Sequence, residues 1–368
     1  MPDPVPPAAA GLSAPLLDAA RGRPSTHTPV WFMRQAGRSL PEYRAVRGEG
    51  SILAAIARPE LAAEITLQPV HRYGVDAAVL YSDIVVPAHA VGFGIDVAPG
   101  TGPVADRPLR RAADLARLRP LVAETDTPYV LETVRILVRE LPPTVPVLAF
   151  AGAPFTVASY LVEGRPSRTY QHVKAMMHAE PAVFGALMER LVQHAVESIS
   201  SQIRCGARAF QLFDSWAGAL SRRDYERDVL PHSRSVFDQL AERHPDVAGI
   251  HFGIGCDHLL PAMHAAGPAV LGLDWRTPIG QARRRLGDDL VVQGNLDPAL
   301  VLAGWEVARG GADEVLADNL RADGSRHPGH IFNLGHGVQP DTDPGVLAEL
   351  VGYVHAATAT PGLTPGRP

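Results

Sequence analysis

The sequence predicts an α/β chain folded as a single (β/α)8 barrel. Eight short apolar runs recur along it, and each is apolar on both faces, as buried parallel strands are. Helical patterns separate the runs, as the crossovers of a parallel sheet require. No GxGxxG motif follows the first run, which disfavours a doubly wound dinucleotide-binding sheet. The expected strands are the runs 30–33, 77–83, 146–151, 209–214, 249–253, 269–274, 290–294 and 330–334.

The N-terminal part is expected to hold a leader, the first strand and two helical stretches. Residues 1–12 are predicted to be disordered, and Ser13 is predicted to cap a short helix that ends at Gly22. Pro41 should open a helix after the first strand. The Gly- and Pro-rich stretch 92–108 is expected to form an excursion with a small hairpin. Further helices of this half are expected at about 52–74, 111–119 and 127–141.

Helical patterns also follow each later run, so the barrel domain is predicted to extend over residues 13–357. A flexible tail is expected at 358–368 because this stretch is rich in Thr, Pro and Gly. The expected helices lie at about 168–204, as a pair of segments, and at about 221–243, 257–266, 278–286, 298–320 and 344–356.

Composition limits the functional classes. The chain has 368 residues, 46% of them hydrophobic, and a net charge of -5, which disfavours a general nucleic-acid binder. The only cysteines, Cys205 and Cys256, are too few for a four-thiolate zinc site, and a reducing cytoplasm suits this composition best. No signal peptide or membrane span is predicted, because prolines interrupt the uncharged stretch 141–162.

Lysine chemistry is nearly absent from this chain. Lys174 is the only lysine among 34 basic residues, and it lies in an ordinary amphipathic helical pattern. Schiff-base and pyridoxal phosphate enzymes need a lysine amine at the reacting centre. The sequence therefore disfavours lysine-dependent covalent catalysis.

Polar residues follow the first run at once, in a loop of Arg34, Gln35, Ala36, Gly37 and Arg38. Arginine binds carboxylates or phosphates through two parallel hydrogen bonds, so two arginines beside Gly37 indicate an anionic ligand. Surface ion pairs are an equally good interpretation of the arginines taken alone. Active sites of barrels lie at the C-terminal ends of the strands, where this loop falls.

The residues that end the other runs are candidates on the same ground. Asp83 has no basic residue in the ten positions after it, so its charge must be met by a ligand or by a distant group. The plainer interpretation is an aspartate that caps the following loop. His336 lies between two glycines, which allow the backbone to approach a ligand closely. The remaining run-ending residues are Ser215, Asp274 and Asn295, of which the last two are interpreted as structural.

Several motifs together resemble one family. The chain carries MRQAGR and LPEYR at 33–44, GAPFTVASYLVEG at 152–164, FDSWAG at 213–218, QGNLDP at 293–298 and FNLGHGV at 332–338. In this order they resemble the uroporphyrinogen decarboxylase family of haem biosynthesis over roughly residues 14–357. The resemblance implies a carboxy-lyase that removes the four acetate carboxyl groups of uroporphyrinogen III, without metal or cofactor, to give coproporphyrinogen III. It also implies a cytoplasmic homodimer.

The resemblance also assigns roles to residues. It implies that Asp83, Arg34 and His336 are catalytic, with Asp83 gathering the pyrrole N–H groups of the tetrapyrrole. Arg34 is then the anchor of the reacting carboxylate and a candidate proton donor, with His336 as the rival. The other implied substrate-binding residues are Gln35, Ala36, Gly37, Arg38, Tyr160 and Ser215.

Two alternatives stay open at the level of the sequence. A zinc-dependent corrinoid methyltransferase of similar fold would use a His-X-Cys pair at the fifth strand, but here His251 is followed two positions later by Gly253. A protein that only binds tetrapyrrole is the other alternative. A complete set of reactive residues disfavours it, since a binder does not need them.

Overall fold

The computed structural model describes residues 14–37, 39–48, 50–98 and 100–361. Four predicted features lie outside this part of the chain: the leader 1–12, the helix cap at Ser13, Arg38 and the end of the tail, residues 362–368. None of its helices is both long and apolar enough to cross a membrane.

Seven parallel strands form the central sheet of the described residues, in the order β1-β4-β5-β6-β7-β8-β9. Every neighbouring pair in this order is parallel. Each strand falls within or beside one of the last seven predicted runs, so these predictions are confirmed. Their bounds are β1 Ala78–Val79, β4 Val147–Gly152, β5 Ala209–Asp214, β6 Ala248–Gly253, β7 Val270–Gly272, β8 Val292–Gln293 and β9 His330–Ile331.

The first predicted strand, 30–33, is not formed as a strand. Val30 makes one isolated parallel bridge to Phe332. The N–H of Val30 donates to the Asp76 side chain, and the N–H of Met33 donates to the Asn333 side chain. Because side chains satisfy these backbone donors, the segment does not continue a regular ladder.

Backbone hydrogen bonds nevertheless reach segment 30–33 from both edges of the sheet. On one side, Trp31 N–H donates to the Phe332 carbonyl over 3.3 Å. On the other, Asp76 N–H donates to the Val30 carbonyl over 2.8 Å. The segment therefore lies between the β9 edge and the β1 edge.

Buried side chains show that the sheet is curled. Trp31 Nε1 donates to Gln293 Oε1, and Gln293 Nε2 donates to Gln211 Oε1 over 2.7 Å. Gln211 is on β5 and Gln293 on β8, with two strands between them. Side chains from strands so far apart meet only across the concave face of a curled sheet.

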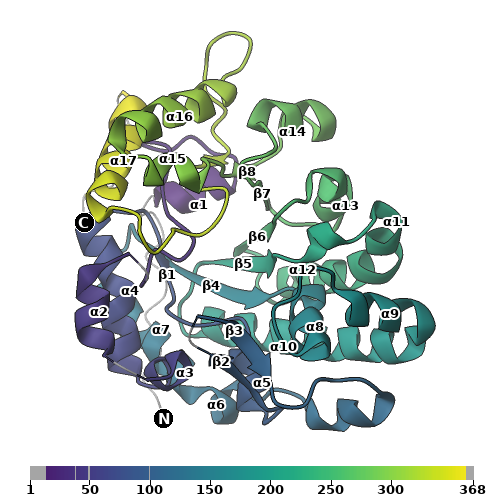
Figure 1. Cartoon of the computed structure of the whole chain (residues 1–368). Helices are drawn as coiled ribbons and strands as arrows, with labels where there is room; N and C mark the ends of the chain where they lie inside the picture. Colours follow the sequence, from purple (N-terminus) through teal and green to yellow (C-terminus); the bar gives the residue numbers. More distant parts are fainter. Residues whose placement is uncertain (1–13, 38, 49, 99, 362–368) are drawn as a thin grey trace.

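Helices surround the sheet on its outer side (Figure 1). In the N-terminal half they are α1 Pro15–Ala20, α2 Pro41–Arg47, α3 Ile52–Ile56, α4 Pro59–Tyr73, α5 Val86–Ala90, the 3₁₀ segment η1 Ala112–Arg117, α6 Ala123–Asp126 and α7 Pro128–Glu140. Pro41 starts α2 as predicted. The stretch 52–74, predicted as helical throughout, forms the two helices α3 and α4, and Pro59 lies in the first turn of α4, which ends at Gly74 with a left-handed φ of 69°. The predicted excursion is an antiparallel hairpin of β2 Ile95–Ala98 and β3 Gly102–Ala105.

The C-terminal half holds the longer helices. They are α8 Pro154–Glu163, α9 Gln171–Ala179, α10 Pro181–Arg204, α11 Arg222–Asp224, α12 Leu230–Arg243, α13 Leu260–Ala265, α14 Ile279–Leu286, α15 Pro298–Leu302, α16 Trp305–Asp318 and α17 Pro344–Ala357, with short 3₁₀ turns η2 Ala217–Ala219 and η4 Asp257–Leu259 and a π-turn η3 Tyr225–Val229. The part of the chain that the structure describes extends beyond residue 357 to residue 361. Thr358 Oγ1 accepts the Thr28 N–H, and Thr360 N–H donates to the Thr26 carbonyl.

Candidate active site

The side chain of Gln35 holds the loop that carries Arg34 in place. Gln35 is buried, its Oε1 accepts the Phe32 N–H, and its Nε2 donates to the Ala77 carbonyl over 2.9 Å. Its own N–H donates to the Phe32 carbonyl, so this donor already has a partner within the loop. Gln35 therefore ties the loop to the start of β1, while Ala36 and Gly37 stay candidate binding residues.

Removing the Gln35 side chain should loosen this loop. In Gln35→Ala the buried Phe32 N–H and Ala77 carbonyl lose their partners, each at a cost of about 1–3 kcal/mol. We expect the free energy of unfolding to fall by about 2–4 kcal/mol, measured by urea denaturation. Gln239→Ala on the outer helix α12 is the control, and an equal loss there would contradict the assigned role.

Arg34 itself is exposed and has a left-handed φ of 62°. Its side chain lies against Gly337. A β-carbon placed on Gly337 would lie 2.6 Å from Arg34 Cδ and 3.2 Å from Arg34 Nε. Val338 N–H donates to the Met33 carbonyl over 2.9 Å, which joins the two loops. The absence of a side chain at 337 thus creates the place where the Arg34 side chain lies.

Asp83 follows β1 and presents a desolvated carboxylate. Val85 N–H donates to Asp83 Oδ1 over 3.0 Å. Burial raises the pKa of Asp83, while the Val85 N–H and the nearby Arg34 charge lower it, and the net shift is upward. Among the described residues Asp83 and Arg34 make no ion pair within 4 Å. The two opposite charges are near each other without neutralising each other directly.

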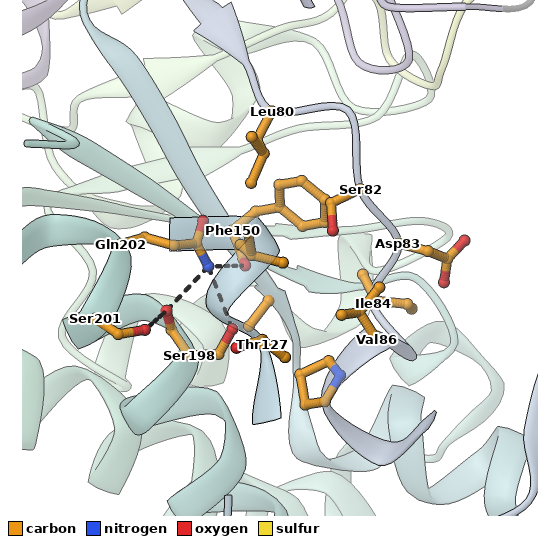
Figure 2. Close-up of a pocket in the computed structure, with 13 residues that line it drawn as sticks. Leu80, Ser82, Asp83, Ile84, Val86, Thr127, Phe150, Ser198, Ser201 and Gln202 are labelled. Carbon is orange, nitrogen blue, oxygen red and sulfur yellow. Dashed lines mark hydrogen bonds between the residues drawn. The ribbon is translucent and has the colours of Figure 1, made fainter. Parts of the chain in front are cut away.

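A small pocket lies behind Asp83, between β1, β4 and α10. Figure 2 shows Gln202 and Ser198 on its far side and the Asp83 carboxylate turned away from them. The volume of this pocket that water can enter is about 10 Å³, which is enough for one water molecule. This pocket is too small for a large ligand, so a substrate must meet Asp83 from the opposite side.

Tyr160 and Ser215 come from α8 and from the turn after β5. The Tyr160 ring packs edge-on against Trp216, with ring centres 5.8 Å apart. Burial, and then the charge of Asp83, raise the pKa of Tyr160 to about 12, so its hydroxyl stays protonated. Thr156 fixes the turn, because its hydroxyl donates to Asp214 and accepts the Trp216 N–H. Ser215 lies half-buried between these two anchored residues.

His336 follows β9 beside Arg34. Its Nδ1 accepts the Gly337 N–H over 2.6 Å. Burial first, and then the Arg34 charge, lower the pKa of His336, so the neutral ring is favoured. A neutral ring whose Nδ1 accepts carries its proton on Nε2. His336 can therefore donate one hydrogen bond from Nε2.

Four predicted residues thus come together around one point. Arg34 acts electrostatically on Asp83, Tyr160 and His336, and Asp83 acts on Tyr160. They come from loops after β1 and β9, from the loop after segment 30–33 and from α8. These ends of the sheet are the C-terminal ends at which the sequence places the site. Arg38 lies outside the described residues.

Arg276 is a further cation at this end of the sheet that the sequence reasoning did not select. Its guanidinium lies 3.9 Å from the Trp275 ring centre, and its Nη1 donates to Asp274 Oδ2 over 2.7 Å. The Arg276 side chain is 50% exposed. Trp275 packs edge-on toward His336, and the Arg276 charge contributes to the lowered pKa of His336. The signal in the sequence is an arginine two positions after the run-ending Asp274.

Asp274 and Asn295 support these loops, as interpreted from the sequence. Asp274 Oδ2 accepts the Gly255 N–H over 2.6 Å. Asn295 Nδ2 donates to the carbonyls of Asp274 and Thr277. The side chains of Asp274 and Asn295 thus connect the turns after β6, β7 and β8.

Lys174 also makes a structural contact, because its Nζ donates to the Ala219 carbonyl.

The fold and site define a parallel α/β protein with a half-buried carboxylate, a cation and neutral hydrogen-bond donors at the C-terminal ends of its strands. The family model for uroporphyrinogen decarboxylase (URO-D) matches residues 12–357. The chain belongs to this family, which acts as a carboxy-lyase.

Curated relatives support the same assignment. A uroporphyrinogen decarboxylase of Salinispora tropica is 54% identical, and the match covers 95% of this chain and 91% of the relative. A uroporphyrinogen decarboxylase of Thermobifida fusca is 53% identical, with 93% and 92% of the two chains covered. Both matches extend over nearly the whole of each chain.

A solved methyltransferase from Methanosarcina mazei has a similar fold. Its TM-score is 0.74 at 18% identity, covering 93% of this chain and 97% of that chain, so the likeness concerns the fold. In this chain His251 and Cys256 are buried. Within the described residues they are not part of a group of three metal-ligating side chains.

Proposed function

We propose that this protein decarboxylates the four acetate arms of uroporphyrinogen III to give coproporphyrinogen III. The observation that carries the proposal is a half-buried, ionisable Asp83 beside an exposed Arg34 with no direct pairing between them. The site thus combines a fixed anion for a cationic ring with a cation for carboxylates. Membership of the uroporphyrinogen decarboxylase family supports the substrate.

Decarboxylation leaves an electron pair on carbon, and the pyrrole ring can accept it. In the proposed reaction a proton adds to a ring carbon next to nitrogen and gives a cation. Loss of carbon dioxide from the acetate arm neutralises that cation and leaves an exocyclic methylene group. A second proton adds to this methylene to form the methyl group, and the ring carbon releases the first proton, which restores the pyrrole. A carboxylate already positioned near the pyrrole N–H groups stabilises the cation electrostatically without reorganising, and Asp83 has this role.

The remaining residues hold the arms of the substrate. Arg34 anchors the reacting carboxylate, and Arg38 takes a neighbouring one. Tyr160, Ser215 and His336 donate hydrogen bonds to further carboxylates, which agrees with the protonated Tyr160 hydroxyl and the Nε2 proton of His336. Arg34 and His336 are rival proton donors. An arginine is a weak acid, and His336 would donate a proton only as an imidazolium, which its lowered pKa disfavours.

The test is anaerobic incubation of chelator-treated protein with uroporphyrinogen III, followed by counting the carboxyl groups of the oxidised products. Products with seven to four carboxylates, formed without added cofactor, would support the proposal. Tight binding without products would identify a carrier. Activity that appears only with zinc and a corrinoid would identify a methyltransferase.

Arg276 extends the cationic surface of the proposed site toward the substrate. If it binds a propionate or acetate arm, Arg276→Ala should raise KM about tenfold, the effect of losing roughly 1.4 kcal/mol of binding, with kcat nearly kept. Steady-state kinetics check this, with Arg276→Lys expected to recover part of the loss. Arg284→Ala on the outer helix α14 is the control, and an equal change there would contradict the assignment.

We further propose that segment 30–33 occupies the position of an eighth strand between β9 and β1. The fold would then be a complete barrel. The hydrogen bonds of Trp31 to Phe332, just after β9, and of Val30 to Asp76, just before β1, support this closure.

A homodimer in the cytoplasm is proposed from the family resemblance. Light scattering on the eluting protein should then give about twice the chain mass of 39.3 kDa. A single-chain mass at micromolar concentration would contradict the dimer.

A further inference from the structure

Three side chains that could bind a metal ion meet at the end of the sheet opposite the proposed active site. His27 precedes segment 30–33, Asp76 precedes β1, and His355 lies on α17. The active-site residues follow their strands, whereas His27 and Asp76 come before theirs. One ligand atom from each of the three lies within 4.8 Å of the others.

The contacts converge on the Asp76 carboxylate. His27 Nε2 lies 2.9 Å from Asp76 Oδ1, and His355 Nε2 lies 2.7 Å from Asp76 Oδ2. The two imidazole rings also pack together, with centres 4.0 Å apart. Both Nε2 atoms therefore point at the same group from two sides.

A second layer of hydrogen bonds orients two of these ligands. Thr26 Oγ1 lies 3.0 Å from His27 Nδ1, so its oxygen can accept an Nδ1 proton and leave the Nε2 lone pair free. Val30 N–H donates to Asp76 Oδ2 over 2.7 Å. Such outer partners are typical of histidine and carboxylate ligands of metal ions.

The electrostatics of the cluster favour a cation. Asp76 is buried, and among the described residues His27 and His355 are the only basic side chains that pair with its carboxylate. A buried carboxylate of this kind needs positive charge beside it, supplied by protons on the imidazoles or by a metal ion. Two imidazole nitrogens and one carboxylate oxygen are a donor set that suits zinc and related first-row ions.

We propose that His27, Asp76 and His355 bind one divalent ion of the zinc type, with water as the fourth ligand. The ion would replace the shared protons between the same atoms. Its role is structural, since it joins the segment before residue 30, the start of β1 and helix α17. Thr360 already holds this region together, because its Oγ1 donates to the Ser25 carbonyl. The proposal does not depend on the proposed enzymatic activity.

The test is titration of chelator-treated full-length protein with Zn²⁺ by calorimetry and thermal unfolding. We expect one ion per chain and, at about 100-fold excess over Kd, a rise in Tm of roughly 3 °C. Uptake should be lost in His355→Gln and in His27→Gln. His71→Gln is the matched control, since His71 is exposed on the neighbouring helix α4 and lies outside the cluster.

Cobalt provides a readout that does not depend on stability. Bound Co²⁺ should show the visible absorption of a site with nitrogen and oxygen ligands, and each cluster variant should lose it. No uptake of Zn²⁺ by the wild-type protein would overturn the proposal. The cluster would then be only a hydrogen-bonded contact between the two histidines and Asp76. Uptake that persists unchanged in both cluster variants would overturn it as well, because the ion would then bind elsewhere.

Discussion

Asp83→Asn is expected to lower kcat by roughly 10²–10³-fold, the effect of removing a group that stabilises charge in the transition state. The amide keeps the shape of the carboxylate and can still accept the Val85 N–H. Only the negative charge beside the substrate ring is lost. Steady-state assays of product formation check this result. Asp238→Asn, exposed on α12, is the control and should keep full activity.

The same substitution should stabilise the protein at neutral pH. The pKa of Asp83 is raised in the folded state, so the folded protein holds this proton more tightly than the unfolded chain does. Stability contributed by Asp83 therefore falls as pH rises through the unfolded and then the folded pKa. At pH 7 the free energy of unfolding of the wild-type protein is lowered by the ionised, desolvated Asp83. Asp83→Asn has no such charge.

Thermal unfolding of the two proteins at several pH values checks this linkage. The Tm of Asp83→Asn should exceed that of wild type at pH 7, and the difference should disappear near pH 4, about the pKa of an unperturbed aspartate. A variant that is inactive and also less stable at pH 7 would contradict the placement of a desolvated charge. Loss of activity would then reflect damage to the fold.

Gly337→Ala is expected to reduce kcat/KM by at least about tenfold, equivalent to roughly 1.4 kcal/mol, because the new methyl group would displace the Arg34 side chain. The β-carbon would fall 2.6 Å from Arg34 Cδ and 2.9 Å from Cγ, which are distances that force the arginine to move. The guanidinium would then leave the position from which it acts on Asp83 and His336. Arg34→Ala should lose at least as much activity.

A double variant separates this effect from a general disturbance. If Gly337→Ala acts through Arg34, adding it to Arg34→Ala should cost little more, since interacting residues are not additive. Gly310→Ala, where a β-carbon meets nothing within 4 Å, is the control. Full additivity of Gly337→Ala and Arg34→Ala in kcat/KM would contradict the proposed contact.

The sequence predicted most of the sheet because buried parallel strands leave a local pattern. Runs such as 209–214 are apolar on both faces, and β5 covers that same stretch. Segment 30–33 has the same apolar character, but its backbone donors are taken by Asp76 and Asn333, which are distant in the chain. Apolar pattern cannot show which side chain will replace a neighbouring strand.

The site was predictable where residues end strands, and less so where folding sets the partner. Asp83 and His336 follow their runs directly, so their place at one end of the sheet follows from the parallel arrangement. Gln35 has a role set by Ala77 and Phe32, which the loop sequence does not reveal. Arg276 was missed because its importance depends on the approach of Trp275 to His336.

The most direct measurement is a single-turnover reaction under anaerobic conditions, with enzyme in excess over uroporphyrinogen III, for wild type and Asp83→Asn. Products are counted by carboxyl number, and bound substrate is measured separately. We expect wild type to yield the seven- to four-carboxylate series without cofactor, whereas the variant should return the eight-carboxylate substrate. The full series from Asp83→Asn at the wild-type rate would contradict the central role of this carboxylate.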